Sequence, residues 1–159
     1  MLGKVLCVLA FGMLAGCGGF SMEQLVPGKT DLASVRQIQE PTAEWINTDG
    51  SRTLEYAWFR GYAQTWMLDF DSRGVLLGSR TVVNEKSAAQ VRVAMTREEV
   101  RRILGKPKRT EDPVAELGEA WVYPLTQVHM ADEVAPVIYI EFHPQVDAVR
   151  NVSVRNILN

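Results

Sequence analysis

The stretch 96–107, TREEVRRILGKP, constrains the fold most, because it specifies the start, the end and the buried side of one helix. Thr96 can accept a hydrogen bond from the first turn while Glu99 reaches back to the N–H of Thr96, which is a capping box. Gly105 in the left-handed conformation and Pro107 after it end the helix. Three apolar residues share one side of this helix: Val100, Ile103 and Leu104.

A weaker version of the same pattern occupies residues 26–42, VPGKTDLASVRQIQEPT. Thr30 corresponds to Thr96 and Pro41 to Pro107, each at an offset of 66 residues. Three apolar residues spaced by three are expected to line one face of this earlier helix: Leu32, Val35 and Ile38. The chain therefore contains two copies of one helical unit, and the first copy lacks both the capping box and the terminal Gly.

Each helical stretch is followed by segments with the two-residue period of β-strands. The expected strands are 52–60, 65–70 and 75–83 after the first helix, and 120–123, 137–142 and 149–154 after the second. A short helix over 84–91, begun by Asn84, is predicted between the two halves. The stretch 109–119 has no clear pattern, and 126–136 is expected to be a long hairpin loop. We predict an α+β chain of two tandem units, each with short helices packed on a small antiparallel sheet.

Residues 1–16 have the composition of a secretory signal peptide, with Lys4 followed by an uncharged apolar run that is short for a permanent transmembrane helix. The residues that end this run resemble the bacterial lipobox: Leu14, Ala15, Gly16 and Cys17. That resemblance implies cleavage before Cys17 and attachment of lipid to its thiol. The alternative is an ordinary signal peptide that happens to contain a cysteine.

Lipidation of Cys17 would decide where the protein works. An anchor with several acyl chains attaches stably, at about 0.8 kcal/mol per buried methylene. Cleavage would also remove Cys7, so no thiol would remain for a disulfide, a metal or a nucleophile. No Asp follows Cys17 as an inner-membrane retention signal, so the implied location is the outer membrane, facing the periplasm. The expected division is 1–16 signal peptide, 17–25 lipidated Cys and tether, 26–83 first unit and 84–159 second unit.

The composition argues against partners that are recognised by net charge. The chain of 159 residues has 17 basic and 19 acidic residues, a formal net charge of −2, and 47% hydrophobic residues. It can bury a substantial core in one domain or two small ones. The near balance of charge gives no electrostatic footprint for nucleic acid or for an anionic membrane surface.

No residue pattern points to catalysis or to a cofactor. His129 and His143 have neither the mutual spacing nor the acidic neighbours of a metal site, and ordinary loop histidines explain them better. Neither Gly-x-Ser-x-Gly nor Ser-x-x-Lys occurs, so nucleophilic catalysis has no candidate. Three aspartates stand out, Asp69, Asp71 and Asp147, of which Asp71 is best explained as a turn former. We expect a protein that is not an enzyme and that binds neither metal nor cofactor.

Aromatic residues are the best candidates for a contact surface. Trp121 and Tyr56 are assigned to the core, where aromatic burial contributes on the order of 1.5 to 3 kcal/mol each. A second group lies near a strand end and forms a hypothetical interface: Trp58, Phe59, Arg60 and Tyr62. The ordinary explanation of that group is isolated aromatic residues at the surface.

These motifs together resemble the SmpA/OmlA (BamE-like) family of small outer-membrane lipoproteins. The resemblance rests on the lipobox, on the T…EEV…LGKP helix, on the W-x-Y strand at Trp121 and Tyr123, and on the F-D-x-x-G hairpin at 70–74. It implies helices on one face of a small antiparallel sheet and a role in outer-membrane barrel assembly. The tandem arrangement is similar to the β-lactamase-inhibitor protein fold. The second hairpin departs from the family pattern, with HPQVD at 143–147 in place of Asp and Gly.

The function expected from the sequence is a lipid-anchored periplasmic interaction module of the outer membrane. Its partner would be another envelope protein, such as the barrel-assembly machinery, and the result would be β-barrel assembly or envelope integrity. Two alternatives stay open: a periplasmic enzyme-inhibitor-like binding protein, and an envelope ligand or stress sensor. Function does not follow from fold alone.

Overall fold

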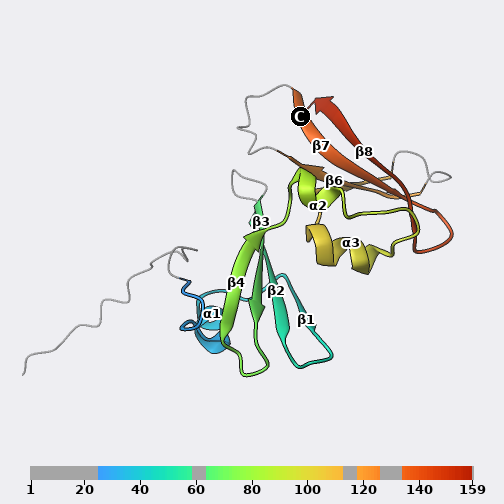
Figure 1. The fold of residues 1–159 in the computed structure, drawn as a ribbon. Coiled ribbons are helices and arrows are strands. Elements are labelled where there is room, and N and C mark those ends of the chain that lie inside the picture. Colours follow the sequence, from blue (N-terminus) through green and yellow to red (C-terminus); the bar gives the residue numbers. More distant parts are fainter. Residues whose placement is uncertain (1–24, 59–63, 113–117, 126–133, 159) are drawn as a thin grey trace, which may run out of the picture.

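The structure is a computed structural model that describes residues 25–58, 64–112, 118–125 and 134–158 (Figure 1). The helices are α1 (Leu32–Ile38), α2 (Glu85–Ala88) and α3 (Arg97–Leu104). The strands are β1 (Ala43–Ile46), β2 (Arg52–Trp58), β3 (Gln64–Phe70), β4 (Leu76–Thr81), β5 (Arg109–Glu111), β6 (Ala120–Pro124), β7 (Val134–Phe142) and β8 (Val149–Leu158). They form two four-stranded antiparallel sheets, ordered β1-β2-β3-β4 and β5-β6-β7-β8. The predicted α+β class with two units is confirmed.

The sheets differ from the sequence prediction in the number and length of their strands. Each contains four strands where three were expected, because β1 and β5 are too short to show a two-residue period. β7 begins at Val134, inside the stretch that was expected to be a loop, and β8 continues past residue 154 to Leu158. Within the described ranges, no helix has both the length and the apolar composition needed to span a membrane.

Helix α1 covers one face of the first sheet. The residues buried between them are Val35, Leu54, Tyr56, Leu68, Phe70 and Leu76, with Leu25, Leu32 and Trp66 packed at the margin. Register explains the grouping, since Leu54 lies opposite Leu68 and Tyr56 opposite Trp66, and cross-strand partners share a face. Tyr56 is fully buried, as predicted, and this burial raises its pKa to about 12.

Two details of α1 correct the prediction made from its repeat. Asp31 caps the helix rather than Thr30, accepting a 2.8 Å hydrogen bond from the N–H of Ser34. Ile38 is 49% exposed, so it does not continue the buried face of Leu32 and Val35. A spacing of three drifts by about 60° per step around a helix of 3.6 residues per turn, which carries Ile38 away from the sheet.

The second unit buries a larger core under α2 and α3. Its buried members are Ala88, Val91, Val100, Leu104, Trp121, Tyr123, Ile138, Ile140, Phe142 and Val149. The rings of Trp121 and Phe142 meet edge to face, with centroids 4.8 Å apart. The capping box at Thr96 and Glu99 is present as predicted, and Asn84 caps α2. Trp121 is therefore a core residue, also as predicted.

Helix α3 lies between the two sheets (Figure 1). Val100 and Leu104 face the core of the second unit. Arg101 faces the first sheet, where its Nε donates a 3.0 Å hydrogen bond to Oε2 of Glu55, a side chain with no solvent exposure. The backbone N–H of Lys106 donates to Oε1 of the same carboxylate at 2.9 Å. One buried acid of the first unit thus accepts two hydrogen bonds from the end of a helix in the second.

Gly105 is where this helix end approaches the first sheet most closely. Its φ of 74° and ψ of −163° fall in a region open essentially to glycine, so the positive φ is as predicted but the conformation is not the left-handed helical one. A Cβ at this position would lie 2.4 Å from Cγ2 of Thr65. On the other side, the hydroxyl of Tyr123 donates a 2.9 Å hydrogen bond to the Gly105 carbonyl. Gly105 therefore fits between the two sheets because it has no side chain.

Gly105→Ala should destabilise the chain by about 3 kcal/mol, since the new Cβ adds backbone strain and a collision with Thr65. Gly28→Ala is the control, because Gly28 also has a positive φ, +77°, but open space around it, so a loss of about 1 kcal/mol is expected. Urea unfolding followed by tryptophan fluorescence measures both losses. Adding Thr65→Ser to Gly105→Ala should restore part of the loss, and equal losses for the two glycines would contradict the close approach.

Arg101→Ala should cost about 3 kcal/mol, because it leaves the buried carboxylate of Glu55 without its guanidinium. Arg102→Ala is the matched control one residue along the helix. Its partner, Glu98, is exposed, so the expected loss is below about 1 kcal/mol. The same unfolding measurement compares the two variants. Similar losses would mean that the pair between Arg101 and Glu55 contributes no more than a surface pair.

Candidate protein-binding site

Most of the interface residues predicted from the sequence lie outside the described residues. This applies to Phe59, Arg60 and Tyr62, and to the lipidation candidate Cys17. Trp58 is the last residue of β2, where its backbone pairs with Gln64. Its side chain is not among the parts that the structure describes. These assignments stay predictions, as does the boundary between units at residue 84.

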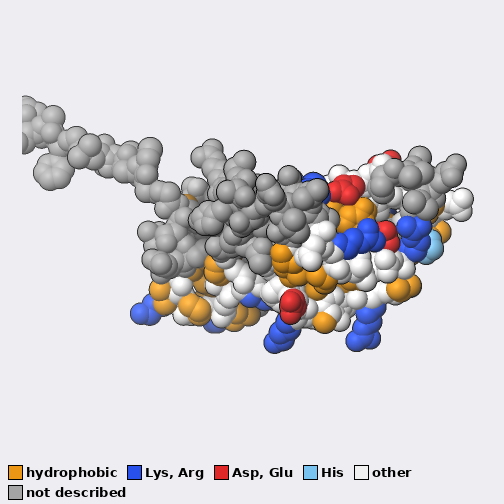
Figure 2. All heavy atoms as spheres, turned by 90° about the horizontal axis from the view of Figure 1, so that it is seen from above, with side chains coloured by type: hydrophobic (Ala, Val, Ile, Leu, Met, Phe, Trp, Pro, Cys, Tyr) orange, Lys and Arg blue, Asp and Glu red, His pale blue; other side chains and the backbone are white. Residues whose placement is uncertain are grey.

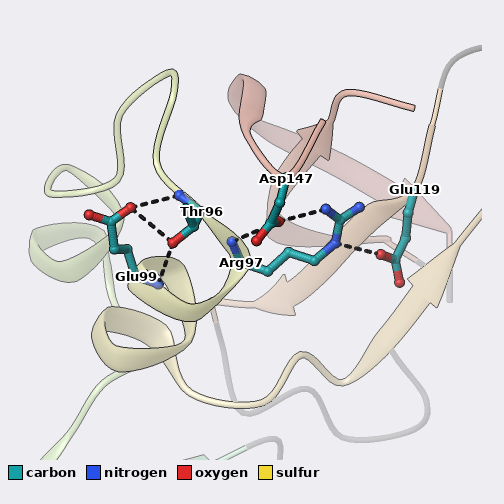
Figure 3. A network of polar contacts seen from close by, with 5 residues as sticks. All are labelled: Thr96, Arg97, Glu99, Glu119 and Asp147. Atoms are coloured by element: carbon teal, nitrogen blue, oxygen red, sulfur yellow. Dashed lines mark hydrogen bonds and ion pairs between the residues drawn. The ribbon is translucent and has the colours of Figure 1, made fainter. Parts of the chain in front are cut away.

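Arg97, the first residue of α3, is the centre of a polar network in the second unit (Figure 3). Its Nε donates a 3.0 Å hydrogen bond to Glu119, and its Nη1 donates a 2.8 Å bond to Asp147. The guanidinium carbon lies 4.3 Å from the centre of the Phe142 ring, so a cation–π contact adds to the two ion pairs. Arg97 therefore joins α3, the residue before β6 and the turn between β7 and β8.

The local sequence explains why Arg97 is held in this position. The capping box of Thr96 and Glu99 satisfies two backbone groups at the start of α3. The N–H of Arg97 remains, and it donates a 3.1 Å hydrogen bond to Asp147. The carboxylate of Asp147 thus accepts from both the backbone and the side chain of one residue, and these bonds lower its pKa. Burial opposes the charge of Arg97, but its bonds to Asp147 and Glu119 raise its pKa overall.

An open polar hollow of about 430 Å³ lies beside this network. Its lining residues are Arg97, Thr110, Glu111, Asp112, Gly118, Glu119, His143 and Pro144. In the wall of the hollow, the backbone at Gly118 packs directly against the Phe142 carbonyl. Only glycine fits there, since a Cβ would lie 2.4 Å from the carbonyl oxygen. The lining has three carboxylates, Glu111, Asp112 and Glu119, and one arginine, Arg97. The hollow therefore suits a partner that presents basic groups or hydrogen-bond donors.

The carboxylate of Glu111 connects the hollow to the outer face of the second sheet. It accepts hydrogen bonds from Tyr139 Oη at 2.9 Å and from Arg109 Nε at 2.7 Å. Burial first, and then the bond to Glu111, raises the pKa of Tyr139. Arg155 stacks 4.0 Å above the Tyr139 ring and pairs with Glu141 at 3.0 Å. This face therefore has a row of fixed charged and aromatic groups that can contact another protein.

The side chains around the hollow offer hydrogen bonds and charge to a partner. His143 is an exposed residue on the rim of the hollow, and His129 lies outside the description. Among the described residues, no group of three His, Cys, Asp or Glu side chains is placed to hold a metal ion. Asp71 accepts hydrogen bonds from the N–H groups of Arg73 and Val75, as expected for a turn former. On the face shown in Figure 2, Lys and Arg side chains are scattered among acidic ones rather than gathered into one patch.

Sequence reasoning singled out Asp147 but neither Arg97 nor Glu119. Glu119 lies in the stretch 109–119 that showed no pattern, and Arg97 looks like any charged residue in a first helical turn. Their convergence depends on how β6 and the β7–β8 turn are placed against α3. A single sequence contains no separate signal for that placement.

Comparison with known proteins concerns this same part of the chain. Residues 80–150 match the family model described as the outer membrane protein assembly factor BamE domain. The match contains α2, α3 and β5 to β7, and with them the Arg97 network and the hollow. No curated protein and no solved structure matches the chain. The resemblance noted from the sequence is confirmed for these residues, while similarity to the β-lactamase-inhibitor protein fold stays a prediction.

Asp147→Asn should lower the melting temperature by about 2 °C near neutral pH, the size expected for an exposed ion pair. Because the native pKa of Asp147 is depressed below 3.8, its stabilisation is present above that pH and is lost as the pH falls through the native pKa. The difference between wild type and variant should therefore shrink as the pH falls below 3.8 and vanish once Asp147 is protonated in the folded state. Thermal unfolding across this range measures it.

The control for Asp147→Asn places the same substitution in an Arg97→Gln background. There it should have a smaller effect near neutral pH, because the guanidinium that favours the charged carboxylate is absent. An unchanged effect would show that Arg97 is not the cause of the pH dependence.

Proposed function

Residues 80–150 match the BamE domain, and from this match we propose that the chain is a lipid-anchored interaction module that assists β-barrel assembly at the outer membrane. The single observation that carries the proposal is the family match over α2, α3 and β5 to β7. That family is described as an outer membrane protein assembly factor. The proposed activity is therefore binding rather than catalysis, and the proposed partner is a component of the barrel-assembly machinery.

The site geometry supports a binding role. The hollow beside Arg97 is open, is lined by groups already held by ion pairs, and lies inside the matched residues. Fixed charges favour recognition, because little side-chain entropy remains to be lost when a partner binds. We place the main contact surface here and keep the aromatic group at the end of β2, Trp58 to Tyr62, as a second contact.

The proposed location depends on the N-terminal segment. Cys17 is proposed to be acylated after cleavage of residues 1–16, with 17–25 as a tether. The protein would then face the periplasm from the outer membrane. The tether would keep the folded units near the membrane surface, since n residues span at most about 3.3–3.6 Å × n.

Photocrosslinking in intact cells tests this proposal. A crosslinking side chain at Thr110 or Pro144, both on the hollow, is expected to capture a component of the barrel-assembly machinery. The same group at Gln37, an exposed position on α1, is the control and should capture at least several-fold less of that protein. The expected difference follows from the position of the hollow on the second unit.

Labelling the same cells with a palmitate analogue adds the anchor to this test. Wild type should take up the label, whereas Cys17→Ser should lose both the label and the crosslink. Capture of a soluble hydrolase instead of an assembly component would contradict the proposal and favour the inhibitor alternative. A crosslink to no protein from either hollow position would remove the hollow as a contact surface.

A further inference from the structure

A second hollow, of about 330 Å³, lies where the first unit meets α2 and α3. Three of its lining side chains are basic: Arg80 from β4, Lys86 from α2 and Arg102 from α3. Among the described residues, no acidic side chain lines it, although the whole chain has a net charge of −2. Asn84 and Gln90 add polar groups to the wall. The charge of this hollow is thus opposite in sign to that of the chain and to that of the hollow beside Arg97.

The basic groups of this hollow are only partly neutralised. Arg80 is paired with Asp69, and Arg102 is paired with Glu98 at 3.1 Å, but neither carboxylate belongs to the lining. Lys86 has no carboxylate within ion-pair distance among the described residues. A guanidinium has five N–H donors, so both arginines retain donors for a further anion. The hollow can therefore accept a carboxylate without breaking an existing pair.

The hollow adjoins a strand edge that is open over part of its length. β4 is the last strand of its sheet, and among the described residues its beginning is covered by bonds between Leu76 and the backbone of Gly28 and Thr30. Near its end, the Thr81 carbonyl accepts a 3.2 Å hydrogen bond from Nδ2 of Asn84, so the N–H groups are the part of this edge that stays open. The N–H of Val82 donates a 3.1 Å hydrogen bond to the carbonyl of Thr65, so the backbone groups of Val82 point toward β3. Because successive residues of an antiparallel strand point their N–H and C=O groups to opposite sides, those of Ser79 and Thr81 point away from β3. No described residue accepts a hydrogen bond from the N–H of Ser79 or Thr81.

The open edge and the basic hollow lie on the same side of the sheet. Arg80 is opposite Met67, and Met67 is opposite Glu55, so all three side chains are on the face that α3 covers. A segment paired with β4 would place every second side chain on that face. Its backbone would bind the strand edge while its side chains enter the hollow.

We propose that the β4 edge at Ser79–Thr81 binds an extended acidic segment of a partner protein, with an Asp or Glu side chain seated in the basic hollow. This is recognition by strand addition, in which main-chain bonds give affinity and a pocket gives specificity. An anionic lipid headgroup would contact the basic side chains but would leave the N–H groups of the strand edge unpaired. A peptide would bind both features. The site is separate from the hollow beside Arg97, and the inference holds whether or not the chain assists barrel assembly.

The test measures fluorescence anisotropy of a labelled peptide of alternating Thr and Glu, added to the full-length chain in neutral detergent. A peptide of alternating Thr and Gln is the matched probe without charge. The acidic peptide should bind at least about tenfold more tightly, and its binding should weaken as salt rises, since about 0.1 M salt already screens charges beyond about 10 Å. Equal binding of both peptides would overturn the proposed role of the basic hollow.

Lys86→Glu should weaken binding of the acidic peptide about tenfold, because it reverses a cation of the hollow that has no ion-pair partner among the described residues. Lys108→Glu makes the same charge change at an exposed lysine outside the hollow and should leave the affinity within about twofold. Equal effects of the two variants would mean that only net charge matters, which contradicts a built site.

The strand pairing is tested separately. Ser79→Pro removes an N–H that bonds to no described residue and should weaken the peptide about tenfold, whereas Ser79→Ala retains the N–H and should not. A peptide N-methylated at alternate residues gives the same test without altering the protein. Full binding of the methylated peptide would overturn strand addition. Lys86-dependent binding of a soluble short-chain anionic phospholipid, with no peptide binding, would assign the site to lipid instead.

Discussion

The rest of the structure depends on one buried carboxylate. Glu55 belongs to β2 of the first sheet and has no exposed surface, yet both of its hydrogen-bonding partners, Arg101 Nε and the Lys106 N–H, belong to the second unit. An ionised carboxylate without such partners would be strongly destabilising in this position. The ion pair therefore ties α3 to the first sheet and sets where the second unit sits. Burial, with a smaller effect of the Glu55 charge, also raises the pKa of Tyr123, whose hydroxyl binds Gly105 at the end of α3.

A helix held from both sides is a good base for a binding site. α3 packs Val100 and Leu104 into one core and fixes Arg101 on the opposite sheet, so Arg97 at its start has little freedom to move. The capping box adds to this by fixing the first turn. The hollow lies among residues that match the BamE model, and its position thus depends on contacts with β2 and β3, strands outside the matched residues. This gives the first unit a physical role in the proposed interaction even where it contacts no partner.

Local sequence predicted what depends on local interactions. The capping box at Thr96, the Asn84 cap, the turn at Asp71 and the strands around Tyr56 and Trp121 follow from short-range spacing, and each is present. The predicted cap of α1 and the predicted burial of Ile38 were wrong, because the weaker repeat was aligned to the stronger one. Glu55 lies between the buried Leu54 and Tyr56 in the sequence and looks like a solvent-facing strand residue. Nothing near it in the sequence shows that a helix 46 residues later covers it.

The two hollows lie beside different turns of α3 and have opposite charge. The start of the helix is beside the acidic hollow that contains Arg97 and Glu119, and its later turn contributes Arg102 to the basic hollow at the β4 edge. Arg102 also lies 5.5 Å from the centre of the Trp45 ring, so its guanidinium is held near the first sheet. A near-neutral chain can thus present two sites of opposite charge on one rigid helix. Partners of opposite charge could then bind at once without competing, which is the arrangement that a connector between two proteins requires.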